Sequence, residues 1–193
     1  MFGIITNKQQ KQQRELFATA VNEYSEALYW HARKLVVLHE DAEDVVQNTF
    51  AKAWSHIGEL KDKNAIKPWL YSIATREALT MLRRKNDVAT DEAAMTALLA
   101  NRFEQSNNIS ANTIEATLQK ALLTLTEQQR VVFNLRYYEE MSYKDISKVM
   151  DITESTAKVH YHNAYNKIVE IIKNDGYGRV KQNSGKTITL QSI

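Results

Sequence analysis

Apolar residues recur at intervals of three and four positions through most of this chain, and that spacing predicts amphipathic helices. Glycine is scarce and proline occurs only at Pro68, so few residues would interrupt these helices. Pro68 suits the start of a helix, where its missing N–H has no partner to lose. We therefore expect an all-α fold. The expected helices span residues 14–38, 41–57, 68–85, 114–125, 126–137, 142–150 and 153–172.

The last two of these helices read as a helix-turn-helix. Ser142 and Thr153 are suited to cap the two helices, and Asp151 lies at the reversal because aspartate tolerates left-handed backbone geometry. Helical spacing places four residues inward: Ala157, Tyr161, Ala164 and Ile168. It places six outward: Ser155, Lys158, Val159, His162, Asn163 and Asn166. An exposed stripe poor in acid and rich in hydrogen-bonding groups suits a DNA major groove, although a helical hairpin with a solvated face would share this pattern.

The pattern divides the chain into two small helical domains joined by a flexible linker. Residues 1–13 are polar and expected to be flexible, and the domains are expected at 14–85 and 112–173. The linker, 86–111, is acidic and contains a candidate short helix over 92–102. The tail, 174–193, alternates at its end in a way that could add an edge strand to another sheet, but disorder is the preferred interpretation.

Composition limits the classes of function. The chain of 193 residues contains no cysteine, which excludes disulfides and thiolate metal sites and fits a cytoplasmic location. No apolar run reaches the roughly 18 residues of a membrane span. At the N-terminus the apolar residues precede the basic ones, which is the reverse of their order in a secretion signal. No catalytic constellation or phosphate-binding glycine loop is evident, and His160 and His162 would point in different directions. We expect a protein that is not an enzyme and needs no cofactor or metal.

Charge changes sign within the first domain. Residues 40–60 hold five acidic residues against one lysine, a net of −4, while residues 61–85 hold seven basic against two acidic residues, a net of +5. The simplest interpretation is two solvated faces. The alternative is that the segments bind two partners of opposite charge, one of them nucleic acid.

Two stretches resemble one family. Residues 41–54 (DAEDVVQNTFAKAW) and 67–85 (KPWLYSIATREALTMLRRK) are similar to region 2 of extracytoplasmic-function (ECF) sigma factors. Residues 125–138 (LTEQQRVVFNLRYY) and 141–147 (MSYKDIS) resemble region 4 of the same proteins. The order and spacing also match, so the chain resembles a group 4 member of the sigma-70 family, an alternative subunit of bacterial RNA polymerase.

This resemblance implies roles for individual residues. Contacts to core polymerase, on the clamp of its largest subunit, are implied for Asp44, Gln47 and Asn48. Contacts to the minus-ten promoter element are implied for Lys61, Lys63, Asn64, Lys67, Trp69, Arg76, Arg83, Arg84 and Lys85. Contacts to the minus-thirty-five element are implied for Ser155, Thr156, Lys158, Val159, His162 and Asn163. Asn64 would read a base edge, and Trp69 would either stack on a base or lie in the core.

The resemblance also implies partners. They are core RNA polymerase (clamp and flap), promoter DNA and an anti-sigma factor. The family often carries arginine near positions 160, 163 and 165, where this chain has His160, Asn163 and Tyr165. Losing arginine removes bidentate contacts to guanine, so we expect weaker or altered upstream recognition. Recruitment would then depend on an additional DNA-bound factor or on the tail. The alternatives are a helix-turn-helix regulator that acts without polymerase and an adaptor that binds only protein.

Overall fold

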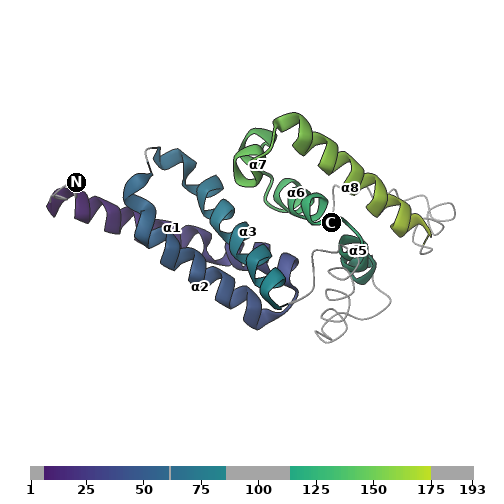
Figure 1. The fold of residues 1–193 in the computed structure, drawn as a ribbon, viewed down its shortest axis with the longest axis horizontal. Helices are drawn as coiled ribbons and strands as arrows, with labels where there is room; N and C mark the ends of the chain where they lie inside the picture. The colour runs from purple at the N-terminus through teal and green to yellow at the C-terminus, as the bar shows by residue number, and fades with distance from the viewer. Residues whose placement is uncertain (1–6, 61, 86–113, 175–193) are drawn as a thin grey trace, which may run out of the picture.

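The computed structural model describes residues 7–60, 62–85 and 114–174, and every regular element in these ranges is helical. The helices form two packed groups (Figure 1). The first group contains α1 (Asn7–Val36), α2 (His39–His56) and α3 (Ile66–Lys85), with the 3-10 turns η1 (Ile57–Glu59) and η2 (Lys63–Ala65) between α2 and α3. The second contains α5 (Ile114–Leu123), α6 (Glu127–Tyr137), α7 (Tyr143–Met150) and α8 (Glu154–Asn174). The predicted all-α fold is confirmed.

The N-terminal helix is longer than the sequence suggested. It begins at Asn7 rather than at Arg14, so residues 7–13, expected to be flexible, are helical. Glutamine and lysine dominate this stretch and are good helix formers, which explains the extension. The helix ends before Val37, whose φ of 70° is unusual for a β-branched residue.

The helix boundaries on either side of residues 58–66 also differ from the expected ones. Helix α2 ends at His56, and Gly58 lies in η1 rather than at the end of the helix. Helix α3 begins at Ile66, because Asp62 accepts a hydrogen bond from the Asn64 backbone N–H at 2.9 Å and starts a 3-10 turn that leads into α3. Pro68 is then the third helical residue, still within the turn whose N–H groups lack helical partners.

The caps predicted in the second group are confirmed. Ser142 Oγ accepts the Asp145 N–H at 3.1 Å, and Thr153 Oγ1 accepts the Thr156 N–H at 3.0 Å. Asp151 adopts the left-handed conformation, with φ 54° and ψ 48°. These local features position α7 and α8 as a helix-turn-helix.

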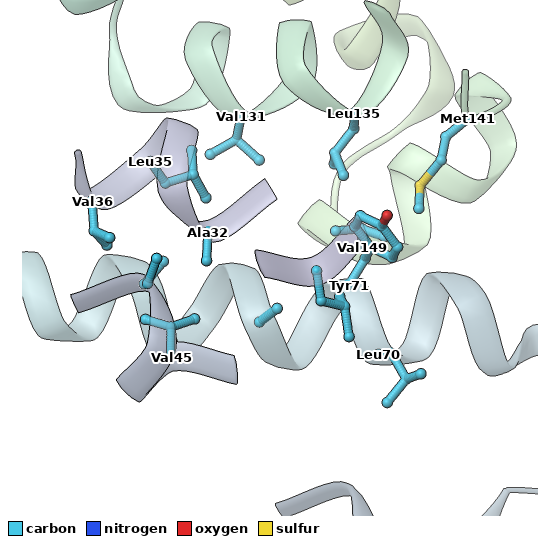
Figure 2. Close-up of a cluster of buried hydrophobic side chains, with 14 of the residues drawn as sticks. Ala32, Leu35, Val36, Val45, Leu70, Tyr71, Val131, Leu135, Met141 and Val149 are labelled. Atoms are coloured by element: carbon cyan, nitrogen blue, oxygen red, sulfur yellow. The ribbon is translucent and has the colours of Figure 1, made fainter. Parts of the chain in front are cut away.

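The two groups share a continuous hydrophobic core, which the sequence analysis did not anticipate. Helix α6 supplies Val131 and Leu135, helix α7 supplies Val149, and the segment between these helices supplies Met141. All four belong to the same buried cluster as Leu35 of α1 and Tyr71 of α3. Figure 2 shows these side chains between the helices of the two groups. A second cluster, including Leu118, Leu122, Phe133 and Ile168, holds α5, α6 and α8 together. Because apolar side chains of both groups are buried in one cluster, the two groups pack against each other as one folded unit.

The predicted linker (86–111) and tail (174–193) lie almost entirely outside the described residues, so the domain boundaries stay predictions. Within the described ranges, no helix combines the length and hydropathy needed to cross a membrane.

Candidate functional site

The outward face of α8 carries the polar stripe that the sequence predicted. Ser155, Lys158, Val159, His162 and Asn163 are exposed, and so is Asn166. Val159 is 55% exposed, which is unusual for a valine in a packed domain. The opposite face buries Ala157, Ala164 and Ile168, with Tyr161 half-buried, as expected. Thr156 is half-buried, and its hydroxyl lies 2.8 Å from that of Thr153.

Aromatic packing fixes the position of α8. Phe133 of α6 stacks on Tyr161 of α8 with ring centroids 5.8 Å apart, and on Tyr137 at 5.1 Å. Farther along α8, Lys167 Nζ donates to the Thr124 carbonyl at 2.5 Å. These contacts hold α8 against α6 and leave the polar stripe uncovered by other described elements. Burial raises the pKa of neighbouring Tyr138 to about 12.

The exposed face of α8 offers donors, acceptors and one apolar group. Asn166 Nδ2 lies 3.0 Å from His162 Nε2, which orients the imidazole along the helix surface. Lys158 Nζ lies 5.8 Å from the centre of the Tyr143 ring, which is a cation–π contact near the start of the helix. Amides and imidazoles bond base edges, and an apolar side chain can contact the thymine methyl group, so this face has the chemistry of major-groove readout.

The acidic segment on α2 divides into a buried and an exposed part. Asp44, Gln47 and Asn48 are exposed, and Asp44 and Gln47 lie one turn apart. Asp41, by contrast, is only 3% exposed. The N-cap of α2 is Leu38, which makes no side-chain capping hydrogen bond.

The candidate minus-ten residues fall into four sets. Lys63, Asn64, Arg76 and Arg84 are exposed. Trp69 is half-buried and packs against the main core, so the structure favours a core role over stacking on a base. Lys61 and the side chain of Lys85 lie outside the described residues.

The fourth set, Lys67 and Arg83, contacts the second group of helices, and Arg83 is exposed as well. Lys67 Nζ donates to the Glu139 carbonyl at 3.2 Å, and Arg83 forms an ion pair with Glu127 at 2.7 Å. The Tyr71 hydroxyl donates to the Glu139 carboxylate. The sequence analysis missed the two glutamates and Tyr71, because no local pattern links residues this far apart in the chain.

No cluster of three or more histidine, aspartate or glutamate side chains in the described ranges could hold a metal ion. His31 is fully buried, with Nε2 2.9 Å from Thr75 Oγ1. Burial, assisted by the charge of Lys34, lowers the pKa of His31 to about 3, which keeps the ring neutral. His31 therefore belongs to the core of the first group.

Comparison with known proteins identifies the family. The model of sigma-70 region 2 matches residues 20–88, and that of sigma-70 region 4 matches residues 108–168. RNA polymerase sigma factor YlaC of Bacillus subtilis (strain 168) is 30% identical over 145 residues, covering 73% of this chain and 82% of YlaC. The chain belongs to the sigma-70 family. This sigma factor is also 25% identical over 161 residues to ECF RNA polymerase sigma factor SigW of the same organism, covering 79% of this chain and 86% of SigW.

A solved structure has the same fold as this sigma factor. Sigma factor RpoE from Bartonella quintana, crystallised with the anti-sigma factor NepR, aligns with a TM-score of 0.63 at 23% identity. The alignment covers 81% of this chain and 96% of that chain. The family assignment makes this protein an ECF-type sigma factor, which binds core RNA polymerase and promoter DNA and acts in transcription initiation.

Proposed function

We propose that this sigma factor binds its partners through three surfaces: α2 binds core polymerase, the η2 loop with α3 binds the minus-ten element, and α8 binds the minus-thirty-five element. It acts as a binding subunit in the cytoplasm, and the chemistry of RNA synthesis belongs to core polymerase. The observation that carries the proposal is the uncovered face of α8, which has no acidic residue between Ser155 and Asn166. That face lies in the same chain as an exposed acidic face on α2.

The polymerase contact is assigned to Asp44, Gln47 and Asn48. All three are exposed, and they stand in the acidic segment, which complements the basic coiled coil expected on the clamp. Asp44→Arg should abolish pull-down of core polymerase. Glu26→Arg, the same charge reversal on the exposed face of α1, should leave it unchanged. Equal binding by both variants would move the polymerase contact away from α2.

The minus-ten contact is assigned to the loop and to the basic end of α3. Lys63 and Asn64 stand exposed in η2, where the Asn64 amide can meet an unpaired base. Arg76 and Arg84 are exposed on α3 and are suited to phosphates, which set register rather than sequence. Asn64→Ala should relax preference at one position of the element, whereas Arg84→Ala should weaken binding to all sequences alike.

The minus-thirty-five contact is assigned to α8, without the arginines that related proteins often carry there. Of the three positions concerned, only Asn163 is exposed, while His160 and Tyr165 are half-buried. Asn163 is therefore the position at which a missing arginine removes most base contact. We propose that upstream binding is correspondingly weak and that a second DNA-bound factor assists recruitment. Tight upstream protection by holoenzyme alone, in a footprinting experiment, would contradict this.

An anti-sigma factor is a further proposed partner, because the structurally similar RpoE is bound to NepR in its crystal structure. The central test of function is run-off transcription with core polymerase on a library of randomised promoters. We expect enrichment at two promoter elements. A chain that binds core polymerase but directs no promoter-dependent transcript would overturn the proposed division of work.

A further inference from the structure

The exposed stripe of α8 carries a single charged residue and no guanidinium. Lys158 is the only lysine, arginine, aspartate or glutamate between Ser155 and Asn166. In the major groove, guanine is read best by arginine or lysine, which can bond its O6 and N7 atoms together. Lys158 is therefore the only residue of the stripe with the usual chemistry for selecting guanine.

Lys158 lies on the side of the stripe nearest the first helix of the motif. Its Nζ is 5.8 Å from the centre of the Tyr143 ring in α7. In helix-turn-helix proteins the first helix crosses the DNA backbone, while the second enters the major groove. Lys158 and Asn163 are five positions apart, which places their side chains about 140° apart around the helix. Lys158 is therefore suited to a phosphate, whereas Asn163 lies on the opposite edge of the stripe.

Only one of the two amides on the stripe is available to a base. Asn166 Nδ2 lies 3.0 Å from His162 Nε2 and can only donate, so Nε2 accepts and a neutral ring carries its proton on Nδ1. His162 then offers a donor that N7 of either purine accepts, which does not distinguish adenine from guanine. Asn163 is exposed, and its side-chain amide makes no hydrogen bond to another residue in the described ranges.

Val159 and Asn163 are the residues of the stripe that can discriminate between bases. They lie one helical turn apart, and Val159 is 55% exposed. An asparagine amide pairs with N6 and N7 of adenine, and an apolar side chain packs on the C5-methyl group that distinguishes thymine. Four helical residues span about 6 Å and successive base pairs are about 3.4 Å apart, so the two contacts fall about one or two base pairs apart.

We propose that α8 selects A·T pairs: Asn163 reads an adenine, Val159 reads a thymine one or two base pairs away, and guanine is selected at neither position. The proposal deepens the assignment of α8 to the minus-thirty-five element and rests on it. Neutral amide and methyl contacts are weaker than the charge-assisted hydrogen bonds of arginine. This readout therefore gives selectivity with little affinity, in keeping with the weak upstream binding proposed above.

A promoter library tests the base preference. Holoenzyme, formed from core polymerase and this sigma factor, is bound to DNA with a randomised upstream region and a fixed minus-ten element taken from the run-off experiment. Low salt keeps weak upstream contacts measurable. We expect enrichment of A·T pairs at two positions no more than two base pairs apart. Val159→Ala and Asn163→Ala should each relax one of these positions. Enrichment of guanine at either of them would overturn the proposal.

Two base analogues test the individual contacts. Uracil in place of the thymine removes only the C5-methyl group and should weaken binding about fourfold, the effect of one buried methyl group. Replacing the adenine with 7-deazaadenine removes the N7 acceptor and should weaken binding about fivefold, the effect of one hydrogen bond.

The two alanine variants are controls for each other. Val159→Ala should abolish the loss caused by uracil and keep the loss caused by 7-deazaadenine, and Asn163→Ala should do the reverse. Both positions are exposed on a helix, where alanine is well tolerated, so the fold should be retained. If both losses persisted in both variants, other residues would read these bases and the proposal would be wrong.

Lys158→Ala separates this proposal from the one on which it rests. If Lys158→Ala weakens binding to all upstream sequences alike while the library shows no preference for A·T pairs, the base assignment is wrong and α8 still binds the element. If the library shows no upstream preference and Lys158→Ala, Val159→Ala and Asn163→Ala all bind like the unchanged chain, both proposals are wrong.

Discussion

Acid should destabilise this protein through one buried histidine. His31 lies in the core of the first group, 0% exposed, with its ring 5.0 Å from that of Tyr71 and its Nε2 bonded to Thr75. Burial, with the charge of Lys34, lowers the pKa of His31 from 6.5 to about 3. The unfolded chain therefore binds a proton that the folded protein excludes. The resulting stability is complete above pH 6.5 and is lost as pH falls from 6.5 toward 3.

The size of the effect follows from the two pKa values. At about 1.4 kcal/mol for each pH unit, the full loss would be on the order of 5 kcal/mol, and about 3 kcal/mol should already be lost at pH 4.5. Domains of this size are stable by roughly 5–15 kcal/mol, so one histidine accounts for a large share. The loss at pH 4.5 should be visible as a lower urea midpoint.

Urea unfolding followed by circular dichroism at pH 7.0, 5.5 and 4.5 measures this effect. In His31→Gln, whose amide can still bond Thr75, stability should fall less steeply with pH than in the unchanged chain. The control is His56→Gln, at an exposed position of α2, which should keep the steep dependence. If the unchanged chain and His31→Gln lost stability in parallel down to pH 4.5, the reasoning from burial would be refuted.

Three further outcomes are expected. Thr126→Ala removes the capping box at the start of α6 and should lower the free energy of unfolding by about 1 kcal/mol, measured by urea titration. Asp151→Gly should be neutral or stabilising, because glycine adopts φ 54° without strain, whereas Asp151→Val should lower the free energy of unfolding by about 1–2 kcal/mol. Asn163→Arg should strengthen binding to the upstream element. The slope of log affinity against log salt concentration should become steeper by about one released counterion, and an unchanged slope would place residue 163 away from phosphates and bases.

Local features of this fold could be predicted from sequence because their causes are local. The caps at Ser142 and Thr153 each depend on a side chain and a backbone N–H three residues apart. The left-handed geometry of Asp151 follows from its residue type and its place between two apolar patterns. The start of α1 at Asn7 was missed because the polar stretch before Arg14 has helix propensity but no apolar face.

The contact between the two groups could not be predicted in the same way. Tyr71 and Glu139 are separated by 68 positions, and neither belongs to a motif that implies the other. Val131 and Leu135 read simply as the apolar face of a helix, and that pattern does not say which neighbour covers them. The exposure of the α8 stripe was predictable, because an amphipathic helix has one buried face whatever covers it.

The change of charge along the first group shows where inference from composition ends. The segment 61–85 holds seven basic residues against two acidic ones, and this balance left two interpretations open: a solvated face, or a negatively charged partner such as nucleic acid. In the structure, Arg83 and Arg84 are both exposed, but Arg83 is paired with a glutamate of the same chain, Glu127. The sign of a segment's charge is the same whether its partner is promoter DNA or a glutamate of the same chain. Only the pairing of each cation distinguishes these cases, and in the described residues the pairing differs between the adjacent Arg83 and Arg84.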